Sequence, residues 1–155
     1  MLSGIKKHNV NRCMKIFITG VAGFLGSHLA DLMISQGHTV AGNDNMIGGY
    51  TDNVPQDVEF HQVDCCDLEN LTKAMEGCDI VYHTAATAYE GLSVFSPVLV
   101  TRNIFEASVT TITAAIRNKV KRIVYCSSMA RYGHHDEVPY KETYECRPQD
   151  PYGIA

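Results

Sequence analysis

Short apolar runs of strand type alternate with longer runs of helical spacing along most of this chain. Residues 24–37, for example, carry apolar side chains three and four positions apart and close on Gly37, which suits the position after a last helical turn. The expected strands are residues 15–20, 38–44, 58–64, 79–86 and 121–128, and the expected helices are residues 24–37, 68–77 and 98–119. This alternation predicts an α/β fold with a doubly wound parallel sheet.

Two strand-like runs, IVYHTAA (80–86) and RIVYCSS (122–128), are almost continuously apolar. Such runs are typical of strands that helices cover on both faces of a sheet, so we expect both strands to be buried. The stretch 45–57 is long and irregular, which favours a functional or mobile loop.

The composition is that of one globular domain. The chain has 155 residues, 45% hydrophobic and 19% charged, and we expect a polar tail over residues 1–13 followed by a domain over residues 14–155. A net charge of -4 argues against a nucleic-acid or anionic membrane partner. No apolar run is long enough for a membrane helix, and the start lacks the apolar core of a secretory signal.

The cysteines and histidines do not predict a metal site. The six cysteines include no C-x-x-C pair, and the HHDE run at 134–137 is more typical of a solvated loop than of a metal site. Without a secretory signal, reduced thiols predict a cytoplasmic protein.

The first strand-to-helix junction reads TGVAGFLG, with glycines at positions 20, 23 and 26. Gly20 permits a tight turn, Gly23 lets backbone amides approach a pyrophosphate, and Gly26 lets the helix lie close to the sheet. The amides at the helix N-terminus then attract phosphate. Asp44 ends the second strand, where a carboxylate can accept hydrogen bonds from both ribose hydroxyls of an adenosine and would repel a 2′-phosphate. The pattern therefore predicts binding of NAD rather than NADP.

Five motifs occur in one order along residues 15–155: TGVAGFLG (19–26), VDCCD (63–67), HTAA (83–86), YCSSMARYG (125–133) and PYGIA (151–155). Together with Asp44 and Asn45 they resemble the extended short-chain dehydrogenase/reductase family, also described as NAD-dependent epimerases/dehydratases. The resemblance implies a Rossmann-type sheet with strand order 3-2-1-4-5. It also implies that NAD contacts Gly20, Gly23, Phe24, Leu25, Gly26, Asp44, Asn45, Asp64, Cys65, Ala85, Ala86, Asn103 and Tyr152.

The resemblance further implies two catalytic residues, Ser128 and Tyr152. Ser128 would hydrogen-bond the substrate oxygen, and Tyr152 would transfer its proton. In the family a lysine four residues after the tyrosine supplies an ammonium on the same helix face, and this sequence ends one residue before that position.

Other polar residues near these motifs have structural interpretations. We expect His83 to be a packing or hydrogen-bonding residue and Tyr132 to pack in the loop after the fifth strand. The segment 88–96 either contacts substrate or covers the start of the long helix.

The resemblance favours a 4-epimerase of nucleotide-activated sugars that uses NAD. A dehydratase is less favoured, because Met129 and Ala130 stand where its family members carry an Asp-Glu pair that transfers protons. A reductase or dehydrogenase of the same family, and a non-catalytic NAD-binding module, remain alternatives.

We expect the sequence to be the N-terminal part of a longer protein, truncated before the last strands and the substrate domain, because no segment is left to cover the fifth strand. Alone, it should bind NAD weakly or aggregate. A nucleotide-sugar substrate is expected only for the longer protein. The same holds for a homodimer, because the resemblance implies pairing through residues 98–119 and the helix that begins at residue 151.

Overall fold

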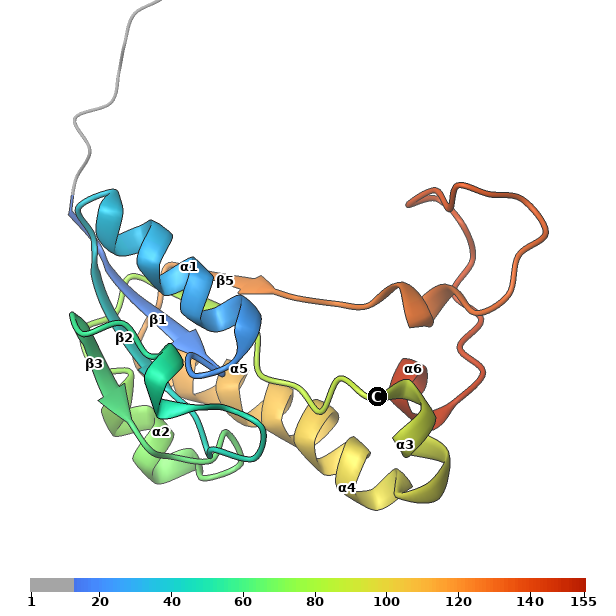
Figure 1. Cartoon of the computed structure of the whole chain (residues 1–155), viewed down its shortest axis with the longest axis horizontal. Coiled ribbons are helices and arrows are strands. Elements are labelled where there is room, and N and C mark those ends of the chain that lie inside the picture. The colour runs from blue at the N-terminus through green and yellow to red at the C-terminus, as the bar shows by residue number, and fades with distance from the viewer. Residues whose placement is uncertain (1–12) are drawn as a thin grey trace, which may run out of the picture.

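The protein, described by a computed structural model over residues 13–155, is built on a five-stranded parallel sheet (Figure 1). The predicted tail, residues 1–13, lies outside the described residues except for Cys13. The strands are β1 (Lys15–Thr19), β2 (Thr39–Asn43), β3 (Val58–His61), β4 (Ile80–His83) and β5 (Arg122–Tyr125). All neighbouring strands pair in parallel, in the order β3-β2-β1-β4-β5, which confirms the predicted fold and strand order.

Helices follow the strands as the alternation predicts. The helical elements are α1 (Phe24–Ser35), η1 (Thr51–Asn53), α2 (Leu68–Ala74), α3 (Glu90–Phe95), α4 (Pro97–Thr101), η2 (Arg102–Glu106), α5 (Ala107–Arg117), η3 (Met129–Tyr132) and α6 (Pro151–Ile154). At the end of α1 the N–H of Gly37 donates to the carbonyl of Ile34, and that of His38 donates to the carbonyl of Met33. This pair of bonds is a Schellman motif, so the predicted role of Gly37 is confirmed.

The predicted single helix over residues 98–119 is shorter and less regular than expected. It begins at Pro97 and ends at Arg117, and its middle, η2, is a π-helical turn between α4 and α5. Helix α3 was not predicted as a helix. Its sequence, EGLSVF, is too short to show a helical period, so only its packing against α4 and α6 reveals it.

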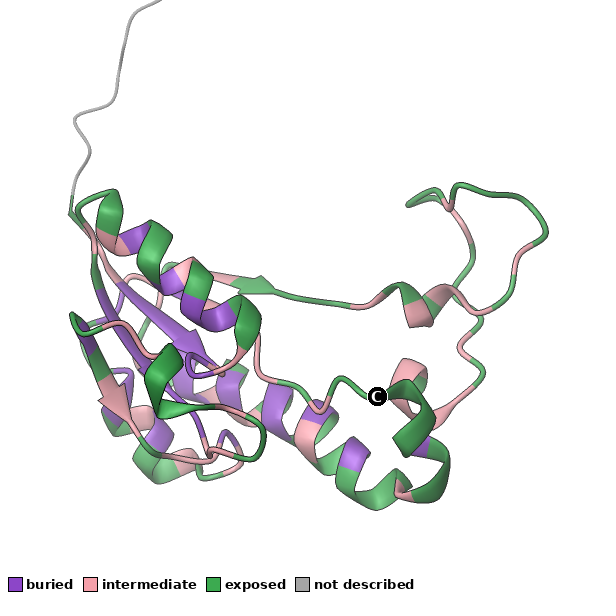
Figure 2. Ribbon diagram, viewed as in Figure 1, coloured by how far each residue is buried: buried purple, intermediate pink, exposed green. Residues whose placement is uncertain are grey.

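The sheet lies between two helical layers and has an apolar core on each face (Figure 2). One core packs α1 against the sheet through residues such as Ile16, Ile18 and Ala30. The other packs α2 and α5 against the opposite face through Phe17 and Leu71 among others. Neighbouring residues of β1 point to opposite cores, as the alternation of side chains along a strand requires.

β5 is more exposed than its apolar sequence suggests. Val124 and Tyr125 are 36% and 45% exposed, so the prediction that both faces of this strand are covered is wrong for β5. The physical reason is its position at the edge of the sheet: β4 pairs with one side of it, and within residues 13–155 no strand pairs with the other.

After β5 the chain leaves the layered body and returns to it (Figure 1). It passes through η3 and a long loop, and then places α6 against α3, α4 and η3. This return brings residues near position 152 close to the carboxyl ends of the strands. None of the helices within residues 13–155 is both long enough and apolar enough to cross a membrane.

Candidate functional site

A cleft of about 480 Å³ lies at the carboxyl ends of the central strands. Parallel α/β sheets bind ligands at this edge, where the strand order reverses. Twelve of the residues predicted to contact NAD line this one cleft: Gly20, Gly23, Phe24, Leu25, Gly26, Asp44, Asn45, Asp64, Cys65, Ala85, Ala86 and Asn103. The thirteenth, Tyr152, lines a neighbouring cavity instead.

The glycine turn leaves the N-terminus of α1 open toward the cleft. A Cβ atom at Gly26 would lie 2.2 Å from the carbonyl oxygen of Gly20, so only glycine allows the helix to begin so close to the turn. No side chain caps the helix, and its first turn contains no acidic residue. The free amides of that turn therefore face the cleft without a protein acceptor, as a bound phosphate would require. This arrangement fits a dinucleotide.

Asp44 is nearly buried at the end of β2, with 8% of its surface exposed, and it lines the cleft. Its Oδ2 atom accepts a hydrogen bond from the Ala22 N–H at 3.1 Å, and its Oδ1 atom accepts one from the Met46 N–H at 2.8 Å. Each carboxylate oxygen can accept a second bond, so the side chain is oriented by the protein and still able to receive ribose hydroxyls.

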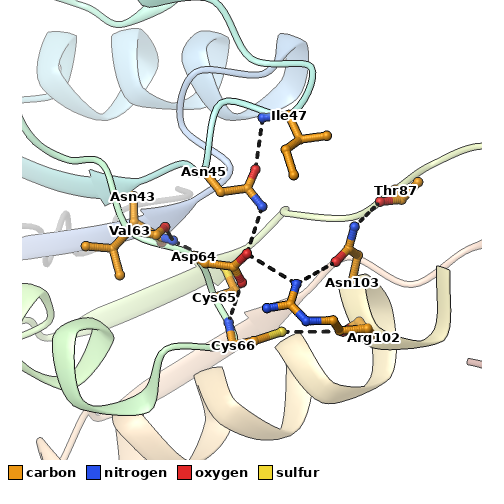
Figure 3. A network of polar contacts seen from close by, with 10 residues as sticks. All are labelled: Asn43, Asn45, Ile47, Val63, Asp64, Cys65, Cys66, Thr87, Arg102 and Asn103. Atoms are coloured by element: carbon orange, nitrogen blue, oxygen red, sulfur yellow. Dashed lines mark hydrogen bonds and ion pairs between the residues drawn. The ribbon is translucent and has the colours of Figure 1, made fainter. Parts of the chain in front are cut away.

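Asp64, which lines the cleft, is the centre of a network of polar contacts (Figure 3). Its Oδ2 atom accepts from Asn45 Nδ2 at 3.1 Å and from Arg102 Nη1 at 3.3 Å, and its Oδ1 atom accepts from the Cys66 N–H at 2.8 Å. Partial burial raises the pKa of Asp64, but these hydrogen bonds and the Arg102 charge outweigh it, so that the pKa lies below its usual value. Asp64 is therefore an ionised acceptor at neutral pH.

The same network continues to the segment after β4. Arg102 Nη1 also donates to Asn103 Oδ1 at 3.1 Å, and Asn103 Nδ2 donates to Thr87 Oγ1 at 2.9 Å. Hydrogen bonds thus join the ends of β2, β3 and β4 to the helical run 97–117 around the cleft (Figure 3). Arg102 and Thr87 were not singled out from the sequence, because charged and hydroxyl side chains are common on helices and loops.

Cys65 also lines the cleft. It is buried and accepts a hydrogen bond from Asn43 Nδ2 at 3.3 Å, and the same nitrogen donates to the Val63 carbonyl at 2.8 Å. Burial raises the pKa of the Cys65 thiol, so it stays neutral at physiological pH. Sequence reasoning missed Asn43, whose only signal was its place directly before Asp44.

Ser128 and Tyr152 line a second, smaller cavity of about 150 Å³. Ala85 and Ala86 line both hollows, so the second cavity adjoins the cleft. Tyr152 reaches this cavity because its helix, α6, packs against η3. At Gly153 in α6, an added Cβ atom would lie only 2.9 Å from the carbonyl oxygen of Ala130 in η3. Glycine at position 153 therefore allows α6 to lie directly against η3, a contact that the sequence alone did not predict.

The hydroxyls of Ser128 and Tyr152 differ in their hydrogen bonds. Ser128 Oγ accepts a hydrogen bond from the Ala130 N–H at 3.2 Å, which leaves its O–H as a donor for a ligand. Tyr152 is half-buried, and within residues 13–155 its hydroxyl has no hydrogen-bond partner. Both residues therefore line the same cavity with a hydroxyl group that is able to donate to a ligand.

His83 has the structural role expected for it. Its Nδ1 atom lies 2.8 Å from Thr19 Oγ1, and its Nε2 atom lies 3.1 Å from Ser108 Oγ. Thr19 Oγ1 already accepts the amides of Thr84 and Ala85, so its proton goes to Nδ1, and the imidazole carries its proton on Nε2. Burial lowers the pKa of His83 to about 4, so it is neutral at pH 7. Through Thr19, the neutral ring is linked to the amides of Thr84 and Ala85 directly after β4. Ala85 lines both the cleft and the second cavity.

Tyr132 packs edge-on against Tyr140, at 6.1 Å between ring centroids, as a packing residue of the loop would. Within residues 13–155, no group of three or more His, Cys, Asp or Glu side chains is placed to hold a metal ion.

A parallel sheet with a glycine turn, an acidic residue after the second strand and a Ser/Tyr pair beside the cleft defines the class of dinucleotide-dependent enzymes with a Rossmann-type fold. The sequence model of the NAD dependent epimerase/dehydratase family matches residues 16–155. The chain therefore belongs to this family.

Similar proteins are sugar-nucleotide epimerases. A probable UDP-arabinose 4-epimerase of Arabidopsis thaliana is 32% identical over 151 residues, covering 90% of this chain and 37% of the plant protein. The UDP-glucose 4-epimerase of Thermotoga maritima, solved with UDP-glucose, superposes with a TM-score of 0.87 at 31% identity, over 91% of this chain and 47% of that one. The UDP-glucose 4-epimerase of Brucella ovis, solved with NAD, has a TM-score of 0.87 at 31% identity, over 92% and 44%. The chain thus spans less than half the length of these relatives.

Proposed function

We propose that the cleft binds NAD and that the protein to which this chain belongs interconverts nucleotide-activated sugars as a 4-epimerase. The observation that carries the proposal is the placement of Ser128 and Tyr152 in a cavity that shares Ala85 and Ala86 with the cofactor cleft. The relatives named above, whose printed activities are 4-epimerisations of UDP-sugars, support the same conclusion.

The cleft residues divide the work of holding the cofactor. The first amides of α1 would receive the pyrophosphate, and Asp44 would accept the ribose hydroxyls. Asp64 would accept the adenine amine beside Cys65, and the small side chains of Ala85 and Ala86 would admit the far end of the dinucleotide. Bound NAD would supply the hydride acceptor and donor at this position.

The chain's own groups would handle the sugar oxygen. Tyr152 would take the proton of the C4 hydroxyl as the hydride leaves that carbon, and would return it when the hydride comes back to the opposite face. The O–H of Ser128, oriented by the Ala130 amide, would donate to the same oxygen and stabilise its negative charge. The positions after Ser128, an exposed Met129 and Ala130, offer no proton donor, which disfavours a dehydratase.

The experiment has two arms. Isothermal titration of NAD into this chain measures the cofactor site, and absence of heat and of any shift in melting temperature would contradict it. The second arm uses the protein encoded by the longest reading frame that contains this chain. NMR measures whether that protein interconverts UDP-glucose with UDP-galactose, and other UDP-, GDP- and dTDP-sugar pairs. Turnover that survives both Ser128→Ala and Tyr152→Phe would contradict the assigned roles.

Two further predictions concern the cellular location and the oligomeric state. A cytoplasmic location, and a homodimer of the longer protein through residues 98–119 and the helix that begins at residue 151, are still expected. Fractionation of the host cell and ultracentrifugation of the longer protein would test them.

A further inference from the structure

Tyr152 lies in the first turn of α6, directly after the helix begins at Pro151. The first N–H groups of a helix have no partner within the helix itself, so the geometry of this turn depends on groups outside it. Helix α6 packs against α3, α4 and η3. The contacts at the start of α6 therefore decide where the Tyr152 hydroxyl lies.

Asp150 caps the start of α6. Its Oδ1 atom accepts a hydrogen bond from the Gly153 N–H at 2.8 Å, and its carbonyl oxygen accepts one from the Ile154 N–H at 3.1 Å. Pro151 follows at the first helical position, where its ring holds the φ angle at a helical value. The two Asp150 bonds close the turn around Tyr152, and so set the direction in which that side chain leaves the backbone.

The same carboxylate contacts α3, which lies beside α6 (Figure 1). Ser93 is fully buried in α3, where its hydroxyl donates to the Glu90 carbonyl at 2.6 Å. Its Oγ atom also lies 3.5 Å from Asp150 Oδ1. Tyr89, directly before α3, lines the cleft. Asp150 therefore connects the helix that carries Tyr152 to a segment that lines the cleft.

We propose that Asp150 is a positioning residue of the 4-epimerase reaction, which holds Tyr152 in the second cavity with Ser128. The inference rests on the proposed function, in which Tyr152 transfers the proton of the sugar hydroxyl. Asp150 lines neither the cleft nor the second cavity, so it acts through the helix and not on the ligand. Proton transfer requires the two oxygen atoms to lie within a fraction of an ångström of their productive positions, so a small displacement of Tyr152 lowers the rate steeply.

The test compares Asp150→Ala, which removes the cap, with Asp150→Asn, whose side-chain oxygen can still accept from the Gly153 amide. Asp67→Ala is the matched control, because Asp67 caps α2 in the same way, through the Asn70 N–H at 3.2 Å, and lines neither the cleft nor the second cavity. The first readout uses the protein encoded by the longest reading frame that contains this chain. For each variant we measure kcat, the KM for the sugar nucleotide and the dissociation constant of NAD.

We expect Asp150→Ala to lower kcat by about 10- to 100-fold, while the dissociation constant of NAD changes by less than about twofold. Asp150→Asn should recover most of kcat, and Asp67→Ala should lower the melting temperature without lowering kcat. A normal kcat in Asp150→Ala would overturn the inference, and so would a loss in Asp150→Asn as large as in Asp150→Ala. An equal loss of kcat in Asp67→Ala would also overturn it, because the effect would then follow from stability alone.

A second readout does not depend on turnover. The chain is labelled with fluorotyrosine, and fluorine NMR identifies the Tyr152 signal by its absence from Tyr152→Phe. A soluble gadolinium chelate broadens the signals of exposed rings. Because Tyr152 is half-buried, Asp150→Ala should increase the broadening of its signal, and Asp150→Asn and Asp67→Ala should leave it near the wild-type value. Unchanged broadening in Asp150→Ala would contradict the inference, whereas absence of turnover by the longer wild-type protein would contradict the proposed function.

Discussion

At the scale of single residues, the cleft depends on side chains whose polar atoms are already oriented by the backbone. Asp44 is held by two amides and Asp64 by an amide and two side chains, so neither has to reorganise when a ligand arrives. Their roles toward NAD remain predictions, and single substitutions separate them from structural roles.

Asp44→Ala should weaken NAD binding by about 10- to 100-fold, because the two ribose hydroxyls lose the charged carboxylate to which they would donate. Isothermal titration of NAD into the chain measures the dissociation constant of NAD. Asp52→Ala, in the exposed η1 turn, is the control and should leave it unchanged. An unchanged affinity in the Asp44 variant would refute the ribose assignment.

His83 should make the chain less stable in acid. Its pKa is about 4 in the folded protein and about 6.5 when unfolded, so the unfolded state binds more protons between those values. Its contribution is complete above pH 6.5 and falls as the pH is lowered toward 4, with a loss of about 2 kcal/mol between pH 7 and pH 5. Urea unfolding at pH 7 and at pH 5 measures the loss in the free energy of unfolding. In His83→Gln this loss should be smaller by about 2 kcal/mol. Equal losses in the two proteins would show that the buried ring does not titrate in this way.

At the scale of elements, the glycine turn and the π-helical turn η2 position the site. The glycine turn starts α1 against the sheet, and η2 carries Arg102 and Asn103 into the network around the cleft. Single π-helical turns inside longer helices occur often at functional sites. The glycine pattern was visible in the sequence. The π turn was not, because it adds one residue to a helical turn without changing the apolar spacing enough to be noticed.

Gly26→Ala should destabilise the chain by more than 2 kcal/mol and abolish measurable NAD binding, because the new Cβ atom would lie 2.2 Å from the Gly20 carbonyl oxygen. Thermal unfolding and NAD titration test both effects. Gly91→Ala is a matched control in α3, where a Cβ atom meets nothing within 4 Å, and it should be neutral or slightly stabilising. Normal NAD binding by Gly26→Ala would contradict this account of the turn.

Arg102→Gln should change stability by less than about 1 kcal/mol, since its ion pair with Asp64 is half-exposed. It should nevertheless weaken NAD binding several-fold, because Asp64 loses the partner that orients it toward the cleft. Arg117→Gln removes a comparable ion pair, with Glu69, away from the cleft and should leave NAD binding unaltered. The same affinity in both variants would mean that the network around Asp64 does not serve the cofactor.

At the scale of the whole molecule, the sheet has an uncovered edge. The outer side of β5 has no partner within residues 13–155, and apolar side chains such as Val109, Ile112 and Ile116 are exposed on α5. The chain spans less than half of its relatives, and exposed apolar edges promote association.

The purified chain should therefore self-associate at micromolar concentration, and Val124→Lys on the edge strand should reduce that association. Sedimentation velocity measures the distribution of species. Val138→Lys introduces the same charge at an exposed position in the loop after η3 and should have little effect. A monomeric wild-type chain, or equal behaviour of the two variants, would rule out the β5 edge as the cause.

The sequence by itself determined the order of strands and helices, the glycine turn and the acidic residues after the second and third strands, because periodicity and turn chemistry are local properties of neighbouring residues. Only the tertiary structure decided what depends on segments far apart in the chain. Gly153 packs against Ala130, Arg102 reaches Asp64, and β5 lies exposed at the edge of the sheet. These contacts join residues whose separation in sequence carries no periodic signal, so they follow from packing and not from pattern.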